Sequence, residues 1–290
     1  MGLLLKCEDV GFGYENQDAV LDVNLEVNEG DYICIVGENG SGKSTLMKGI
    51  LGLLKPTSGR IEYSEELKKA GIGYLPQQTD AQKDFPATVF EVVISGCLGK
   101  RGSRPFYSMK EKKEARANLD RLGIPDSCIF LPCRPGVIRA DRKLVLCQKQ
   151  RVLIARALCA TDKLLILDEP ITGLDPSAIL DFYQLIRKLN QEEKVAILMV
   201  SHDMANIVHQ GGKILQMRQK PLFWGTMKEY VKSEIAHSFL GREELATLGH
   251  RCGVPMQKDG IRKMQKPEMG SETDSETKQH LKDRNEEKEV

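Results

Sequence analysis

The sequence predicts an α/β fold, and three stretches of the chain carry that prediction. A short apolar run at 31–36 leads through the glycine-rich segment 37–45 into a segment of helical composition at 46–51. Two later apolar runs, 164–167 and 195–200, are typical of buried strands, and polar residues follow each of them. Buried strands separated by helical segments predict a mainly parallel sheet with helices packed on it.

The glycine-rich segment matches the pattern G-x-x-x-x-G-K-[ST], and it has the preceding strand and following helix that this pattern requires. Glycines let the backbone curl so that N–H groups point at phosphate oxygens, and the helix N-terminus adds its positive end. Lys43 is expected to reach the β- and γ-phosphates, and the Ser44 hydroxyl to bind Mg²⁺. A glycine-rich turn with an incidental lysine is the alternative. The predicted phosphate-binding residues are Gly37, Asn39, Gly40, Ser41, Gly42, Lys43, Ser44 and Thr45.

The first part of the chain predicts an antiparallel pair of strands within residues 3–27, because polar and apolar residues alternate there. Tyr14 ends the first of these strands, where its ring could stack on a purine or simply pack locally. Residues 59–63 and 72–75 predict further strands, and the second of them stops just before Gln77.

Residues 79–160 predict a helix-rich region. Thr88 stands in N-cap position before a helix ending at 94, and 109–122 predicts a charged helix with one apolar face. The apolar residues of 133–143 follow neither the helical nor the strand period, and this segment is rich in arginine and lysine. Helical character resumes from 150 to 160.

Carboxylates and a histidine follow the two buried strands. Asp168 and Glu169 end the strand that begins at Leu164, where Asp168 fits a Mg²⁺ ligand and Glu169 a base that polarises attacking water. His202 follows the strand 195–200, where it could hold a γ-phosphate. Two ordinary surface acids and a structural histidine are the plainer alternatives. A helix is predicted after Asp175, through residue 189.

Composition limits the function classes. Lys and Arg number 42 against 41 Asp and Glu, so overall charge gives no reason to expect a nucleic-acid partner or direct binding to a membrane surface. No apolar run approaches the ~18 residues of a membrane span, and the N-terminus does not resemble a signal peptide. The eight cysteines lack paired spacing, which favours reduced core residues in a cytosolic protein.

Taken together, these motifs resemble the nucleotide-binding subunit of ATP-binding cassette (ABC) transporters over roughly residues 3–240. The resemblance implies a RecA-like P-loop NTPase core, an antiparallel β subdomain and an inserted helical subdomain at about 79–160. It divides the chain into an ATP-binding domain, 1–240, and a C-terminal extension, 241–290. The implied motifs are the Walker A loop at 37–45, Walker B at 164–169, the adenine-stacking Tyr14, the Q-loop Gln77 that contacts Mg²⁺ and water, the D-loop Asp175 and the switch His202.

The resemblance also implies cofactors and partners. They are ATP and Mg²⁺, a transmembrane permease subunit, a second copy of the chain in a head-to-tail homodimer and, indirectly, a substrate-binding protein. Such a subunit lies in the cytoplasm on the inner face of the cell membrane, held by the permease. Residues 85–93 and 223–240 are similar to zinc and manganese uptake ATPases, so a divalent metal is the expected cargo.

The signature motif Leu-Ser-Gly-Gly-Gln departs from the family. Its slots hold Leu144, Val145, Leu146, Cys147 and Gln148, so only the first and last residues match. Val145 offers no hydroxyl, and two side chains replace the glycines that approach the γ-phosphate of the opposite subunit. A catalytically weakened regulatory or interaction subunit is therefore the alternative function.

The end of the chain differs in composition. From Gln257 onward there are no aromatic residues, five scattered apolar residues and dense mixed charge. Such a segment buries too little surface to offset its ordering entropy, so disorder is expected from about residue 253.

Overall fold

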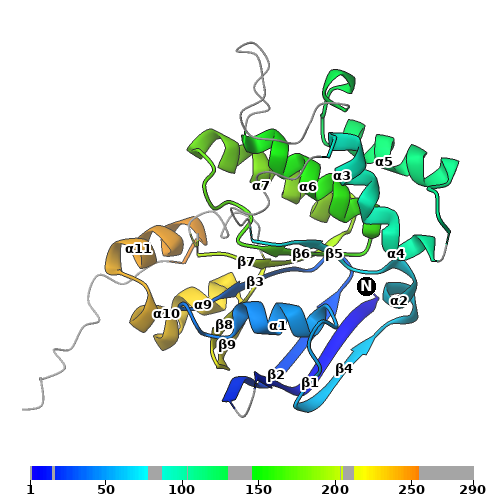
Figure 1. The fold of residues 1–290 in the computed structure, drawn as a ribbon. Helices are drawn as coiled ribbons and strands as arrows, with labels where there is room; N and C mark the ends of the chain where they lie inside the picture. Colours follow the sequence, from blue (N-terminus) through cyan, green and yellow to red (C-terminus); the bar gives the residue numbers. More distant parts are fainter. Residues whose placement is uncertain are drawn as a thin grey trace, which may run out of the picture. The chain divides into compact units, whose positions relative to one another are not determined.

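The computed structural model describes residues 2–14, 17–77, 87–102, 104–129, 146–202, 204 and 212–254. Contacts divide the chain into Met1–Val254 and Pro255–Val290, and all the described residues belong to the first unit (Figure 1). The expected disordered tail, the irregular segment 133–143 and the signature residues Leu144 and Val145 lie outside the described residues. Among the described helices, none is long and apolar enough to cross a membrane.

A six-stranded sheet forms the core, in the order β5-β6-β7-β3-β8-β9. Neighbouring strands are parallel except for β9, which runs antiparallel to β8, so the predicted α/β fold is confirmed. Every residue of β3, β6 and β7 is buried, as the unbroken apolar runs predict. The strands are β3 (Tyr32–Val36), β5 (Gly73–Leu75), β6 (Leu164–Asp168), β7 (Ala196–Val200), β8 (Lys213–Arg218) and β9 (Lys220–Thr226).

A second sheet is antiparallel, in the order β2-β1-β4. Its strands are β1 (Leu3–Tyr14), β2 (Gln17–Asn28) and β4 (Ser58–Tyr63). Helix α1 (Lys43–Ile50) lies between the two sheets, with Leu46 and Met47 in their shared apolar core (Figure 1). At Gly49 the packing is so close that an added Cβ would lie 1.9 Å from Cζ of Phe12.

The other face of the core sheet carries the helix-rich region. Thr88 caps α3 (Val89–Ile94) with a reciprocal capping box, as its position predicts, and α5 (Met109–Arg121) starts with a second one at Ser108. Helix α6 begins at Leu146, earlier than the sequence predicts. The remaining elements of this region are the 3₁₀ turn Ser95–Cys97, α4 (Leu98–Arg101), the 3₁₀ turn Asp126–Cys128, α6 (Leu146–Ala160) and α7 (Pro176–Gln191).

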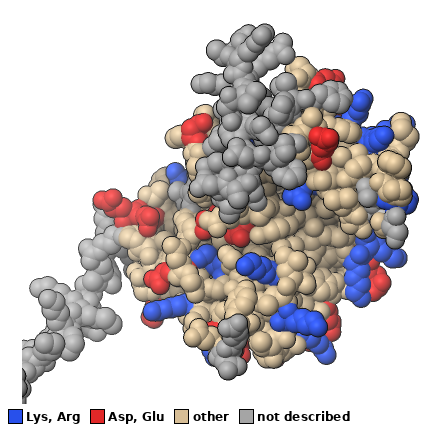
Figure 2. Space-filling model, viewed as in Figure 1, with Lys and Arg blue, Asp and Glu red and all other residues tan. Residues whose placement is uncertain are grey.

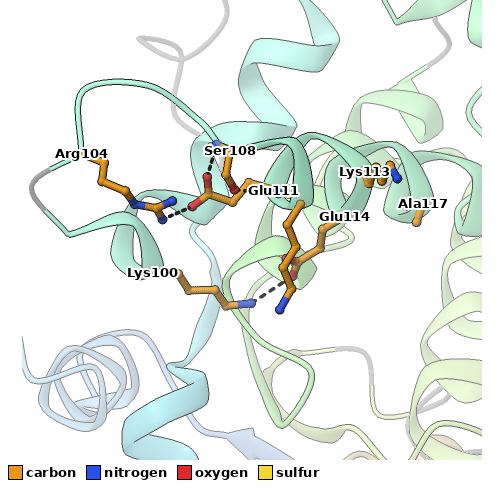
Figure 3. Close-up of a pocket in the computed structure, with 8 residues that line it drawn as sticks. Lys100, Arg104, Ser108, Glu111, Lys113, Glu114 and Ala117 are labelled. Carbon is orange, nitrogen blue, oxygen red and sulfur yellow. Dashed lines mark hydrogen bonds and ion pairs between the residues drawn. The ribbon is translucent and has the colours of Figure 1, made fainter.

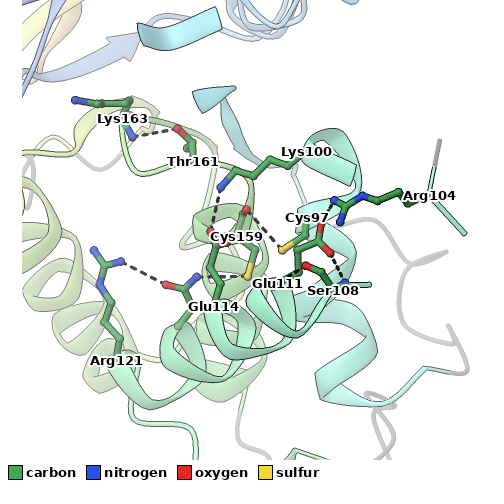
Figure 4. A network of polar contacts seen from close by, with 11 residues as sticks. Cys97, Lys100, Arg104, Ser108, Glu111, Glu114, Arg121, Cys159, Thr161 and Lys163 are labelled. Carbon is green, nitrogen blue, oxygen red and sulfur yellow. Dashed lines mark hydrogen bonds and ion pairs between the residues drawn. The ribbon is translucent and has the colours of Figure 1, made fainter. Parts of the chain in front are cut away.

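Polar contacts join these helices beside their apolar core (Figure 4). The Asn118 amide of α5 donates to Sγ of Cys159 in α6 at 3.4 Å, and Lys100 pairs with Glu114 at 3.0 Å. Cys97 and Cys159 are buried, and all the described cysteines are free thiols, as the sequence predicts.

Short helices surround the rest of the domain. They are α2 (Glu65–Ala70) after β4, and α9 (Met227–Lys232), α10 (Glu234–Phe239) and α11 (Arg242–Arg251) after β9. On the face drawn in Figure 2, Lys and Arg side chains are interspersed with Asp and Glu, in keeping with the balanced composition.

Candidate nucleotide site

The glycine-rich loop joins the carboxyl end of β3 to the first turn of α1, and its glycines hold positions that other residues could not. Gly42 has φ +93°, and a Cβ there would lie 2.5 Å from the Ala19 carbonyl oxygen. Gly37 has φ +155°, and a Cβ there would lie 2.3 Å from the Met217 carbonyl oxygen. The loop is therefore pressed between β2 on one side and β8 on the other.

Lys43 extends back under this loop. Its Nζ donates to the carbonyl oxygens of Gly37 at 2.9 Å and Glu38 at 2.7 Å, and to Oγ of Ser41 at 3.4 Å. The side chain is 6% exposed, and burial lowers the pKa of the ammonium, while Glu169 and Asp168 oppose that shift. A buried cation below a glycine-rich loop at the start of a helix is suited to an anionic ligand.

Asp168 ends β6 with 5% of its surface exposed. Burial is the main cause that raises the pKa of this carboxyl group, and the neighbouring Glu169 charge raises it further. The hydroxyl of Tyr74 on β5 lies 3.5 Å from Oδ2 of Asp168, and burial and then this carboxylate raise the pKa of Tyr74 to about 12. The sequence pattern does not single out Tyr74, because the contact depends on the pairing of β5 with β6.

Glu169 stands in the middle of the predicted catalytic residues. Nε2 of Gln77 donates to Oε2 of Glu169 at 2.8 Å, and Nε2 of His202 lies 3.0 Å from Oε1. The three residues follow three strands of the sheet, β5, β6 and β7, whose carboxyl ends meet at one edge. Glu169 has φ +47°, a left-handed conformation, and its backbone N–H donates to the Val200 carbonyl at 3.1 Å.

These side chains open into one pocket of about 560 Å³. Its walls combine the loop residues with the Glu169 group, and an unpredicted residue, Phe239 of α10, also lines it. An adjoining pocket of about 360 Å³ continues from Glu169 and His202 along Thr172 and Ser201. The other residues lining the first pocket are Gly37, Glu38, Asn39, Gln77 and His202.

A larger pocket, of about 780 Å³, lies far from this chemistry, between α4 and the first half of α5 (Figure 3). Lys100 and Arg104 in its wall are already paired, with Glu114 at 3.0 Å and Glu111 at 2.9 Å. Its described lining contains neither the glycine loop nor Gln77, Glu169 or His202, so the predicted site residues gather at the smaller pocket.

Two further predicted site residues, Asp175 and Tyr14, are not among the described residues that line the pocket of about 560 Å³. Asp175 is the N-cap of α7: its Oδ1 accepts from the Ala178 N–H at 2.9 Å and from the Ser177 hydroxyl at 2.7 Å. The Ser177 contact lowers the pKa of Asp175 most. Tyr14 is 48% exposed at the end of β1, in the hairpin whose second strand touches the loop at Gly42.

Ser44 and Thr45 form the first turn of α1, with Lys43. Gln148 lies in the first turn of α6, but its side chain is outside the described part of the chain. Within the described residues, no group of three or more His, Cys, Asp or Glu side chains could hold a metal ion on protein ligands alone.

Comparison with known proteins shows the family of the chain. Residues 20–172 match the family model described as "ABC transporter". The zinc uptake system ATP-binding protein ZurA of Listeria monocytogenes is 34% identical over 237 residues, covering 79% of this chain and 88% of the relative. The zinc import ATP-binding protein ZnuC 2 of Aliivibrio fischeri is 35% identical over 232 residues, covering 79% and 86%.

A solved structure provides the same fold with a ligand. The dimeric, post-hydrolysis state of the ATP-binding cassette MJ0796, bound to ADP and Pi, superposes with a TM-score of 0.61 at 25% identity, covering 77% of this chain and 98% of that one. Subunits of this kind dimerise and work with permease partners. The chain belongs to the ABC transporter family and is one of its ATPase subunits.

Proposed function

We propose that this ATPase subunit energises the uptake of a divalent metal, zinc or manganese, through a membrane permease. The position of Glu169 supports the assignment of ATP hydrolysis to this site. Glu169 is held between Gln77 and His202, beside the glycine-rich loop. The metal cargo is supported by the zinc uptake and zinc import relatives.

ATP binding is assigned to the loop and its surroundings. The N–H groups of 37–45 and the Lys43 ammonium hold the phosphates, and Tyr14 at the neighbouring hairpin stacks on the adenine. Ser44, Asp168 and Gln77 offer hydroxyl, carboxylate and amide oxygens, which are the hard ligands that Mg²⁺ prefers. Bound there, Mg²⁺ would offset the charge of the β- and γ-phosphates.

Hydrolysis is assigned to Glu169, His202 and Gln77. Glu169 accepts the proton of the attacking water, and its two carboxylate oxygens are already oriented by Gln77 and His202. His202 stays on the phosphate side of the same pocket, where its ring can contact the γ-phosphate. Asp175 holds the start of α7 and so shapes the loop that follows Glu169.

Two copies of the chain form the ATP-hydrolysing part of the transporter. The signature segment of each copy faces the nucleotide that is bound by the other copy. The permease holds the pair at the inner face of the cell membrane, and a substrate-binding protein delivers the metal from outside. A catalytically weakened regulatory subunit is not favoured by the relatives, which carry the names of uptake and import proteins.

One experiment tests the proposal directly. The chain is reconstituted with its permease and binding protein. ATP turnover and metal uptake are then measured with zinc and manganese, the proposed cargoes, and with nickel as a comparison metal. Glu169→Gln should bind ATP and trap a dimer while turnover falls, typically ~10²–10⁴-fold for a lost general base. Hydrolysis that continues unaltered in this variant would assign the base to another residue.

The signature segment has its own test. Replacing Val145 with Ser and both Leu146 and Cys147 with Gly restores the family pattern, and the combined variant should raise turnover and ATP-driven dimerisation. If the unaltered chain already hydrolyses ATP as fast as the restored variant, another segment supplies these contacts.

A further inference from the structure

Phe239 is the one Phe, Tyr or Trp among the described residues that line the pocket of about 560 Å³ beside the glycine-rich loop. It is the last residue of α10, and it is 37% exposed. Figure 1 shows α9 and α10 beside the end of α1 that carries the loop. The segment lies beyond residue 172, where the family match ends, so the family model does not account for this residue.

The elements that bring Phe239 to the pocket are fixed to the loop. The backbone N–H of Gln219, in the turn between β8 and β9, donates to the Ser41 carbonyl at 2.9 Å. On β8 itself, the Met217 carbonyl lies against Gly37 with no room for a side chain. Movement of this hairpin would therefore move the loop with it.

Helices α9 and α10 are in turn fixed to β8. The Tyr230 hydroxyl of α9 donates to Oε1 of Gln216 at 2.8 Å, and Gln216 is a β8 residue only 2% exposed. Ser233 joins the two helices, since its N–H donates to the Tyr230 carbonyl at 2.9 Å and its hydroxyl caps α10 by accepting from Ala236 at 3.2 Å. The position of Phe239 beside the loop is thus built into the domain.

The apolar ring of Phe239 differs in chemistry from the groups around it, which are suited to phosphate binding. Its neighbours in the pocket are a glycine of the loop, two carboxylates, two amides and an imidazole. A phosphate gains nothing from a benzyl group, whereas aromatic side chains inside a polar rim are enriched at protein–protein contacts. A second copy of the chain is the occupant to expect, because subunits of this family dimerise and the related MJ0796 cassette holds ADP and Pi in a dimer.

We propose that Phe239 is a dimer-contact residue that the second copy of this chain covers when ATP is bound. Helix α10 then forms part of the rim that closes the pocket and keeps bulk water from Glu169 and His202. The inference rests on the proposed function, because it requires the ATP-bound homodimer.

The test compares dimerisation with nucleotide binding in one background. In Glu169→Gln, which traps bound ATP, Phe239→Ala should weaken the ATP-dependent dimer by about 10-fold or more in Kd, measured by analytical ultracentrifugation. Affinity of the dilute monomer for a fluorescent ATP analogue should not change. Phe239→Leu should keep most of the dimer strength, and Leu222→Ala, on β9 and 45% exposed, is the matched control for loss of an exposed apolar side chain.

A spectroscopic variant gives an independent readout. Trp224 is the only tryptophan, so Trp224→Phe combined with Phe239→Trp places a single indole at the rim. Its emission should shift to shorter wavelength when ATP drives dimerisation, because the ring leaves water.

The outcomes separate this inference from the function on which it rests. If Glu169→Gln dimerises with ATP and Phe239→Ala changes nothing, the inference is wrong and the proposed function stands. Loss of ATP affinity in the Phe239→Ala monomer would also overturn it, because the ring would then act within its own subunit. Failure of Glu169→Gln itself to dimerise would contradict the proposed function and this inference with it.

Discussion

Replacing Lys43 with Met is the sharpest single test of the phosphate site. The change removes the ammonium and keeps a long apolar stem in a position that is 6% exposed. Charge-assisted hydrogen bonds are worth about 1.5–3 kcal/mol each, so two of them to phosphates would contribute about 3–6 kcal/mol.

That gross figure overstates the effect, because the free loop already uses the ammonium. Lys43 donates at 2.9 and 2.7 Å to two loop carbonyls, and turning to the phosphates gives up one or two such bonds. With about 1 kcal/mol lost for each, the net contribution is about 1–5 kcal/mol. ATP affinity should therefore fall about 5- to 5,000-fold.

The assay is equilibrium titration of the purified monomer with ATP by calorimetry. Lys55→Met is the control, because Lys55 is an exposed cation just after the same helix and its loss should leave affinity nearly unchanged. Equal affinities in the two variants would refute the assignment of Lys43 to the phosphates.

Three further changes test other parts of the structure. His202→Ala should slow ATP hydrolysis far more than it weakens ATP binding, as phosphate release and titration would show. Gly49→Ala should cost about 1–3 kcal/mol or more in urea unfolding, since the new Cβ would meet the Phe12 ring, while Gly99→Ala, in α4 with open space around it and no positive φ, should leave stability unchanged or raise it by up to about 1 kcal/mol. Asp175→Ala should remove about 1 kcal/mol of stability as a lost N-cap, and a change in ATP affinity larger than the change in stability would favour the D-loop role instead.

The sequence predicts the central strands because burial on both faces leaves a visible pattern. Runs such as 164–167 contain only apolar residues, and they can belong only to buried elements. Strand β8 is missed for the opposite reason. Gln216 interrupts it, and that buried amide is tolerated because Tyr230 donates a hydrogen bond to it from α9. A partner that arrives from a later helix leaves no local signal.

The residues of the site likewise divide into those that the sequence predicts and those that it misses. Gln77, Glu169 and His202 follow separate strands, and the rule that parallel strands end at one edge predicts that they meet. Tyr74 and Phe239 are missed because neither belongs to a local motif, and only pairing and packing bring them to the pocket.

The sequence around Asp175 fits two roles, the D-loop of the family and a helix N-cap. An Asp directly before a Pro that starts a helix is a common N-cap pattern, and the structure places Asp175 in that role.

The position of β3 in the sheet has a consequence for synthesis of the protein on the ribosome. Strand β3 and its loop emerge early, yet the strands that flank β3 are β7 and β8, at 196–200 and 213–218. Strand β7 is available once the chain has grown past residue 200, but β8 and the bond from the Gln219 N–H to the Ser41 carbonyl are available only once it has grown past Gln219. Nascent chains stalled before that point should fail to retain ATP, and those stalled well after it should hold the nucleotide, so ATP binding would report completion of the sheet.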